Sequence, residues 1–243
     1  MGAFGAAVQC GFPTTRAPLR SALKQDNPHS LLTAATGPDP IQNRHLGQVF
    51  AGLQEHFDQI DLMTYVLSGP WPGWMTWHGS PLYSGGLHFT GGRELPSIES
   101  NARNFLEAGV KPQKLGIGLA FHGDVWTGGT GTSTGGVTAP QQTWDIAPML
   151  KNDVPYSEIL SRYDLPKHGH FDVVTQTPYL SIDQKGSARD VFVSYNDPVG
   201  ITARLHFLED LGLGGCIIWH LGQDLMPSGQ QPLADAVATF LKE

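Results

Sequence analysis

Four short apolar runs alternate with helix-like segments along the chain, and this alternation constrains the fold more than any other feature. The runs have the length of buried strands, and apolar residues recur at helical spacing between and after them. The runs cover 30–35, 59–67, 114–121 and 215–221, and the helical segments cover 43–57, 97–108, 197–211 and 235–242. This order is typical of βαβ units with parallel strands. We therefore predict an α/β fold with about four parallel strands, half of what a closed eight-stranded barrel requires.

Two segments interrupt this order. Residues 68–92 form an aromatic and glycine-rich stretch that is too long for a plain connection, so we expect it to serve a binding face. Residues 127–196 begin with glycine and threonine and continue through strand-like runs at 171–175, 178–182 and 190–195. We predict a small inserted α+β lobe at 127–196, a parallel unit made of 30–126 and 197–243, and a separate N-terminal segment at 1–29.

The charge balance excludes several classes of partner. Lys and Arg number 15 and Asp and Glu number 22, which gives a net charge of -7. This balance predicts no binding of nucleic acid or of an anionic membrane, and a neutral or cationic small partner fits better. No stretch approaches the roughly 20 apolar residues of a membrane helix, and residues 1–13 show no secretory signal. The two cysteines form no metal-binding motif, so we expect no metal and no cofactor.

Several motifs together carry a resemblance to a known family. They are Met63-Thr64-Tyr65, Ser80-Pro81-Leu82-Tyr83, Phe121-His122-Gly123, Val193-Ser194-Tyr195-Asn196-Asp197-Pro198 and Gly215-Cys216-Ile217-Ile218-Trp219. In this order and spacing they resemble the C-terminal half of glycoside hydrolase family 18, the chitinase family. The resemblance implies an incomplete (β/α)8 TIM-type barrel, equivalent to strands five to eight, with the inserted α+β lobe. Residues 1–29 match nothing in the family.

The departures from the family pattern are as informative as the matches. The family cleaves β-1,4-linked N-acetylglucosamine polymers with the substrate's own acetamido oxygen as nucleophile and a Glu as acid. That Glu ends a D-x-x-D-x-D-x-E motif, which the 243 residues do not contain. Val66 replaces the Asp that follows Met-x-Tyr, His122 replaces a Tyr, and His220 stands where many members have Glu. The resemblance therefore implies a chitinase-like protein that has lost family hydrolysis, and whether it is an enzyme stays open.

The resemblance also implies a set of sugar-binding residues. Tyr65 would hydrogen-bond an acetamido group, and Trp219 would stack beneath a sugar ring. The full set is Met63, Tyr65, Trp71, Trp74, Trp77, Trp126 and Trp219. Its expected ligand is a chito-oligosaccharide or another small neutral molecule. Each aromatic residue has an alternative interpretation as ordinary core packing.

Two alternatives to sugar binding remain. The pairs His122 with Asp124 and His220 with Asp224 follow strands at the rim where barrel enzymes carry out chemistry. A His beside a carboxylate can act as a general base, so these residues could cleave an ester or a lactone. Ser133, in a G-x-S-x-G stretch, is a weaker candidate nucleophile. The other alternative is a truncated chitinase without function, and we expect a homodimer to cover the open half-barrel.

Overall fold

In the computed structural model, residues 16–37, 44–184 and 188–242 are described. A parallel sheet in the order β1-β2-β3-β9 forms the first layer. Its strands are β1 (Thr33–Thr36), β2 (Gln59–Leu62), β3 (Leu115–Ala120) and β9 (Gly215–Trp219). Each strand overlaps one of the four apolar runs. The first half of the segment 1–29 lies outside the described residues.

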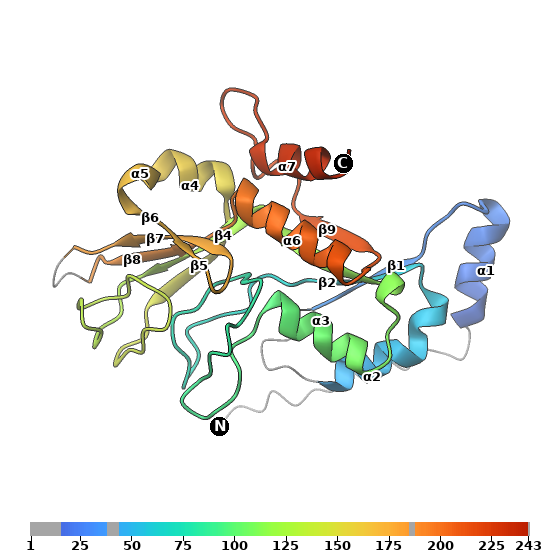
Figure 1. The fold of residues 1–243 in the computed structure, drawn as a ribbon, viewed down its shortest axis with the longest axis horizontal. Helices are drawn as coiled ribbons and strands as arrows, with labels where there is room; N and C mark the ends of the chain where they lie inside the picture. Colours follow the sequence, from blue (N-terminus) through green and yellow to red (C-terminus); the bar gives the residue numbers. More distant parts are fainter. Residues whose placement is uncertain (1–15, 38–43, 185–187, 243) are drawn as a thin grey trace.

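Two pairs of helices pack beside this sheet, and a fifth helix, α1 (Arg16–Asp26), belongs to neither pair. The paired helices are α2 (Arg44–Leu53), α3 (Ile98–Glu107), α6 (Pro198–Asp210) and α7 (Pro232–Phe240), with short 3-10 turns at Gln54–His56 and Pro112–Lys114. Figure 1 shows α2 and α3 together on the lower side of the sheet and α6 and α7 together on the upper side. Within the described residues, none of these helices is both long and apolar enough to cross a membrane.

Local capping chemistry explains where the two central helices begin and end. The Ser97 side chain accepts a hydrogen bond from the Ser100 backbone N–H at 3.0 Å, and this starts α3. The Asp197 carboxylate does the same for Gly200 at 2.7 Å, followed by a proline in the first turn of α6. Gly109 follows the end of α3. Its φ of 97° is a backbone conformation that residues with a side chain rarely adopt.

A second, antiparallel sheet forms the other layer, in the order β5-β4-β8-β7-β6. Its strands are β4 (His122–Thr127), β5 (Met149–Pro155), β6 (Gly169–Asp172), β7 (Thr177–Ile182) and β8 (Val191–Ser194), with helices α4 (Tyr156–Arg162) and α5 (Leu165–His168) between them. Figure 1 shows this sheet to the left of the parallel one. Only Phe121 separates β3 from β4, so the second sheet begins at His122, five residues before the expected start of the lobe at 127.

Strand β2 is shorter than the sequence predicts. The apolar run extends to Leu67, but the strand ends at Leu62 and the chain then turns, with Val66 at a φ of 57°. The Thr64 hydroxyl replaces strand pairing, because it donates to the Gly118 carbonyl at 3.1 Å and accepts from the Gly118 N–H at 2.9 Å. Tyr65 therefore lies on a turn after the strand, and alternation along the strand does not decide where it points.

One apolar cluster joins the two sheets. Leu119 and Phe121 at the end of β3 pack with Val154 of β5, Leu180 of β7 and Ile201 of α6. All five are almost completely buried. This cluster fixes the carboxyl ends of the parallel strands against the start of the antiparallel sheet.

Candidate functional site

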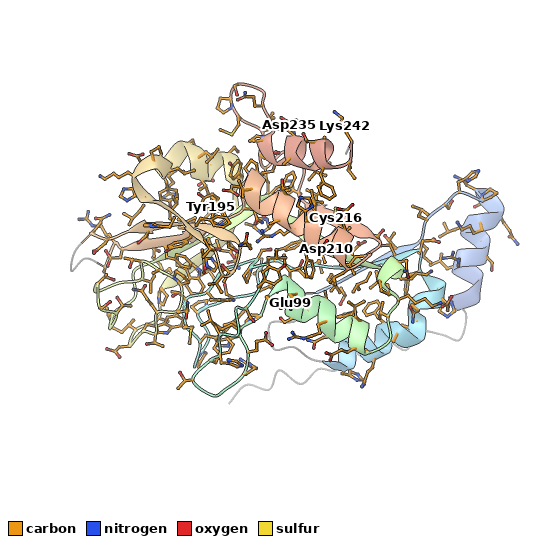
Figure 2. All side chains as sticks on the ribbon, in the orientation of Figure 1. Glu99, Tyr195, Asp210, Cys216, Asp235 and Lys242 are labelled. Atoms are coloured by element: carbon orange, nitrogen blue, oxygen red, sulfur yellow. The ribbon has the colours of Figure 1, made fainter. Side chains whose placement is uncertain are left out.

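A small cavity lies where the two sheets meet, and we call it the junction cavity. Its volume is about 10 Å³, which is room for roughly one water molecule. The polar residues that line it include Tyr65, Ser80, His122, Asp124, Ser194 and Asn196. Tyr195, labelled in Figure 2, also borders it. The cavity lies beyond the carboxyl ends of β2 and β3, which is the end where barrel proteins bind substrates.

Three buried polar atoms on residues that line this cavity have no hydrogen-bond partner. They are the Tyr65 hydroxyl, Oδ1 of Asp124 and Oδ1 of Asn196. The Asn196 amide nitrogen donates to the Ala120 carbonyl at 3.0 Å, so its oxygen is the atom left without a partner. An unpaired buried polar atom costs roughly 1–3 kcal/mol, so such a cluster marks a place where a ligand or water supplies the missing bonds.

Burial controls the charge of Asp124. Its side chain is almost inaccessible, and this burial raises the pKa of its carboxyl to about 7, against the opposing effect of a hydrogen bond from the Asp153 backbone. The negative charge of Asp153 acts in the same direction as burial. A Cβ at position 79 would come within 1.8 Å of Oδ2 of Asp124, so glycine is required there.

A bulge in β5 brings Asp153 to the site. Asn152 and Asp153 lie opposite the single residue Asp124, and Asp153 has a φ of 59°. Its carboxylate lies 3.3 Å from Nδ1 of His122 and accepts a hydrogen bond from the Gln223 amide at 2.8 Å. Sequence spacing paired His122 with Asp124, but the contact is with Asp153.

His122 is nearly buried and stands edge-on to the Tyr65 ring, with ring centroids 5.6 Å apart. Burial lowers the pKa of its imidazole, although Asp153 opposes this. The backbone carbonyl of Trp219 lies 3.2 Å from its Nδ1. His122 is therefore neutral at pH 7 and adds no positive charge to the cavity.

A hydrogen-bonded chain that spacing alone did not indicate supports one wall of the cavity. His78 is completely buried, with Nδ1 3.1 Å from the Ser194 hydroxyl and Nε2 3.2 Å from the Asp172 carboxylate. Burial opposes ionisation of Asp172, but hydrogen bonds from His78 and Thr175 outweigh it and hold its pKa at about 2. The pKa of His78 is lowered by burial. The chain ties the loop after β2 to the antiparallel sheet.

The predicted sugar-binding tryptophans separate into two groups. Trp77 and Trp126 are completely buried, so they belong to the core and cannot stack on a ligand. Trp74 packs between Trp71 and Phe89, at ring distances of 4.5 and 4.7 Å. Trp71 and Trp219 remain exposed, at 42% and 48%. Met63 lies half-buried on the turn after β2.

His220 and Asp224 do not form a catalytic pair. Asp224 is completely buried, and its Oδ2 accepts hydrogen bonds from the backbone N–H groups of Leu233 and Ala234 at 3.0 and 2.9 Å. It therefore caps the first turn of α7. His220 is exposed, and its Nδ1 lies 2.9 Å from the Leu221 carbonyl. A capping carboxylate committed to two backbone donors is not free to orient a histidine.

Ser133 lies outside any catalytic arrangement. It is an exposed residue of a tight turn in which Thr132 and Gly135 pair across from each other. An esterase elbow needs a strand before the serine and a helix after it, and neither flanks this turn. The ester or lactone alternative therefore gains no support here. Within the described residues, no group of three or more His, Cys, Asp or Glu could hold a metal ion.

The unpartnered Tyr65 hydroxyl leads to a prediction about stability. Replacing Tyr65 with Phe removes a buried hydroxyl that has no protein partner. We expect the free energy of unfolding, measured in urea, to rise by about 1 kcal/mol with an unchanged m-value. A decrease of more than about 1 kcal/mol would contradict the absence of a partner.

Comparisons with known proteins agree with the fold described above. The model of "Glycosyl hydrolases family 18" matches residues 10–224, so the match includes most of the segment 1–29. Chitinase A1 of Niallia circulans is 27% identical over 224 residues, covering 86% of this chain and 30% of that protein. Chitinase B of Serratia marcescens is 26% identical over 245 residues, covering 83% of this chain and 47% of that protein. The chain thus spans less than half the length of these relatives.

Solved structures show the same architecture. A family 18 N-acetylglucosaminidase from Paenibacillus barengoltzii has a TM-score of 0.71 at 24% identity, covering 93% of this chain and 61% of the other. A Group IV chitinase from Ostrinia furnacalis has the same TM-score at 22% identity, covering 94% and 61%. These likenesses establish a TIM-barrel-type α/β fold. Together with the motifs at the strand ends, the family match over residues 10–224 shows that the chain belongs to glycoside hydrolase family 18.

Proposed function

We propose that this chain binds β-1,4-linked amino-sugar oligomers of the chitin type and does not hydrolyse them by the family mechanism. The observation that carries the proposal is a pair of side chains near the strand ends that are each available to a ligand. The Tyr65 hydroxyl is buried without a partner, and the Trp219 side chain is half-exposed at the end of β9. A hydroxyl that needs a partner and an accessible indole ring are the two kinds of group that hold a sugar.

The missing acid supports the second half of the proposal. The 243 residues contain no D-x-x-D-x-D-x-E motif. Asp124 has a pKa of about 7, as a general acid needs, but it is enclosed in a cavity of about 10 Å³. A glycosidic oxygen carries a sugar ring on each side and cannot enter that space. Proton transfer to the leaving group therefore has no suitable donor in this site.

The names of similar proteins are consistent with carbohydrate binding. The structure of the Ostrinia furnacalis Group IV chitinase is a complex with allosamidin, and a Group II chitinase domain from the same organism is a complex with an N-acetylglucosamine oligomer. A chitinase-like agglutinin from Robinia pseudoacacia has the same fold at a TM-score of 0.66. These ligands belong to those proteins, and they indicate which ligands to test on this chain.

Binding can be tested by tryptophan fluorescence. We expect chitotetraose to change the emission of the wild-type chain, and Trp219→Ala to weaken its binding at least tenfold, equivalent to about 1.4 kcal/mol. Leu211→Ala is the matched control, because Leu211 is a comparably exposed apolar residue at the end of α6 and before β9. Calorimetry should give the same dissociation constants. Absence of binding by both methods, or an equal loss in the control, would contradict the proposal.

We also propose that the parallel sheet is the carboxyl-terminal half of a family barrel and that a second copy completes it. In the described residues, β1 and β9 are the outer strands of the sheet. Exposed apolar residues adjoin these strands in the sequence, namely Leu31 before β1 and Trp219 and Leu221 at and after the end of β9. Pairing β9 of each copy with β1 of the other would close eight parallel strands.

The dimer makes its own prediction. Sedimentation equilibrium should give twice the chain mass of 26.3 kDa, and Leu221→Asp should shift the chain to a monomer. Val199→Asp, at an equally exposed site on α6, should leave the mass unchanged. A wild-type monomer at all accessible concentrations would contradict the dimer.

A further inference from the structure

We infer that the junction cavity accepts a primary ammonium group, so that the sugar unit bound there is glucosamine with a free amine rather than N-acetylglucosamine. This inference rests on the proposed function, because it concerns which amino sugar the same site prefers. Three observations support it: the buried polar atoms of the lining residues that have no hydrogen-bond partner, the charge around the cavity, and the size of the cavity.

The unpartnered atoms match the donors of an ammonium group. Oδ1 of Asn196 can only accept, and the Tyr65 hydroxyl can accept or donate. Oδ1 of Asp124 accepts when its carboxyl, which has a pKa of about 7, is ionised, and the positive charge of an ammonium group beside it favours that form. A primary ammonium group offers three N–H donors, one for each of these oxygens. The amide nitrogen of Asn196 is already committed to the Ala120 carbonyl, so the side chain cannot rotate to offer a donor without losing that bond.

An acetamido group fits these atoms less well. It has one N–H donor and one carbonyl acceptor, and among the three unpartnered groups only the Tyr65 hydroxyl can donate to that carbonyl when Asp124 is ionised. The single N–H then satisfies either Asp124 or Asn196 and leaves the other oxygen buried and unpaired. That mismatch costs roughly 1–3 kcal/mol, which is enough to decide between the two sugars.

The charge around the cavity points the same way. None of its described lining residues is a lysine or an arginine. His122 is neutral because burial lowers the pKa of its imidazole, and the Asp153 carboxylate lies 3.3 Å from it. When Asp124 is ionised, its carboxylate and that of Asp153 give the cavity a negative potential, which the buried Arg204 guanidinium at the Ser80 carbonyl offsets only in part. The net charge of -7 on the whole chain attracts a cationic oligomer as well.

Size adds a third argument. The cavity volume of about 10 Å³ accommodates a group about as large as a water molecule. An ammonium group has one heavy atom, whereas an acetamido group has four. The wall is closely packed here, because a Cβ at position 79 would clash with Oδ2 of Asp124 and the Gly79 N–H donates to the Ser194 hydroxyl at 3.2 Å. The acetyl group would have to displace side chains that the His78 hydrogen-bonded chain holds in place.

The test compares two tetrasaccharides by calorimetry at pH 7 and 150 mM salt. We expect the tetramer of glucosamine to bind the wild-type chain at least tenfold more tightly than the tetramer of N-acetylglucosamine. Asp124→Asn, which preserves shape and removes the charge, should abolish this preference. Asp210→Asn is the matched control, because it removes one charge at the C-terminal end of α6, away from Tyr195 at the cavity (Figure 2).

Each outcome has a distinct meaning. Tighter binding of the acetylated tetramer would overturn the inference and leave the proposed function standing. An equal loss of preference in both variants would also overturn it, because the preference would then reflect net charge. Failure of both tetramers to bind would overturn the proposed function itself and the inference with it. Unfolding curves of both variants establish that they are folded. The comparison of the two tetramers on the wild-type chain tests the inference even if a variant does not fold.

Discussion

Replacing Arg204 with Ala is expected to lower the free energy of unfolding by about 3–5 kcal/mol, the largest effect of any single substitution considered. Arg204 lies on α6 and is completely buried. Its guanidinium donates to the carbonyls of Gly200 at 2.8 Å and Gln176 at 3.2 Å, and also to the carbonyl of Ser80. The substitution leaves these carbonyls without that donor and opens a void at the junction of the two sheets.

The reason for so large an effect is that Arg204 joins three separate parts of the chain, one of which, Ser80, lines the junction cavity. Ser80 lies in the aromatic stretch 68–92, Gln176 precedes β7 and Gly200 belongs to α6. Burial lowers the pKa of the guanidinium to about 10, so it remains charged at pH 7 and its hydrogen bonds are charge-assisted.

Urea unfolding measures this prediction. Arg204→Met keeps much of the volume and should lose less stability than Arg204→Ala. Arg162→Ala, at an exposed arginine of α4, should change the free energy of unfolding by less than about 0.5 kcal/mol. A loss below about 1 kcal/mol in Arg204→Ala would show that the buried carbonyls find other donors.

The second large effect is a dependence of stability on pH that Asp124 controls. The pKa of its carboxyl is about 7 in the folded chain against an ordinary value of 3.8, so the folded state holds the proton more tightly. Its contribution is therefore present in full below about pH 4 and is lost as the pH rises through about 7. A shift of this size corresponds to roughly 4 kcal/mol.

Asp124→Asn removes this dependence. The variant and the wild type should have similar free energies of unfolding near pH 4, and the variant should be more stable by roughly 4 kcal/mol at pH 8. Asp61, with a pKa raised by burial, and Asp172 titrate in both proteins, so the difference between the two curves isolates Asp124. Asp210→Asn should give a curve parallel to the wild type. Parallel curves for Asp124→Asn would contradict the buried, unpaired carboxylate.

The sequence predicts those parts of the fold that local chemistry determines. Ser97 and Asp197 cap helices because their side chains reach backbone N–H groups two to three residues away, and a reader of the sequence can see both ends of that bond. The buried strand β3 is recognisable because all six of its residues are small or apolar. Motifs at the strand ends also carry the family resemblance.

The rest of the site depends on contacts between distant parts of the chain. His78 and Ser194 are 116 positions apart, and no spacing rule connects them. Asp153 reaches His122 only because a bulge in β5 redirects its side chain. The local sequence could not show that Trp77 is buried and Trp219 is exposed, because both follow stretches with apolar or aromatic residues.

The central claim is that this chain binds chitin-type oligomers without hydrolysing them by the family mechanism. The most direct test incubates the wild-type chain with saturating tetrasaccharide, acetylated and deacetylated in parallel, and follows binding by calorimetry and products by chromatography. The account predicts a measurable dissociation constant for at least one tetramer and no release of shorter sugars beyond a protein-free control. Release of chitobiose that stops in a variant of any carboxylate of this chain would contradict it, because an acid outside the missing motif would then be at work.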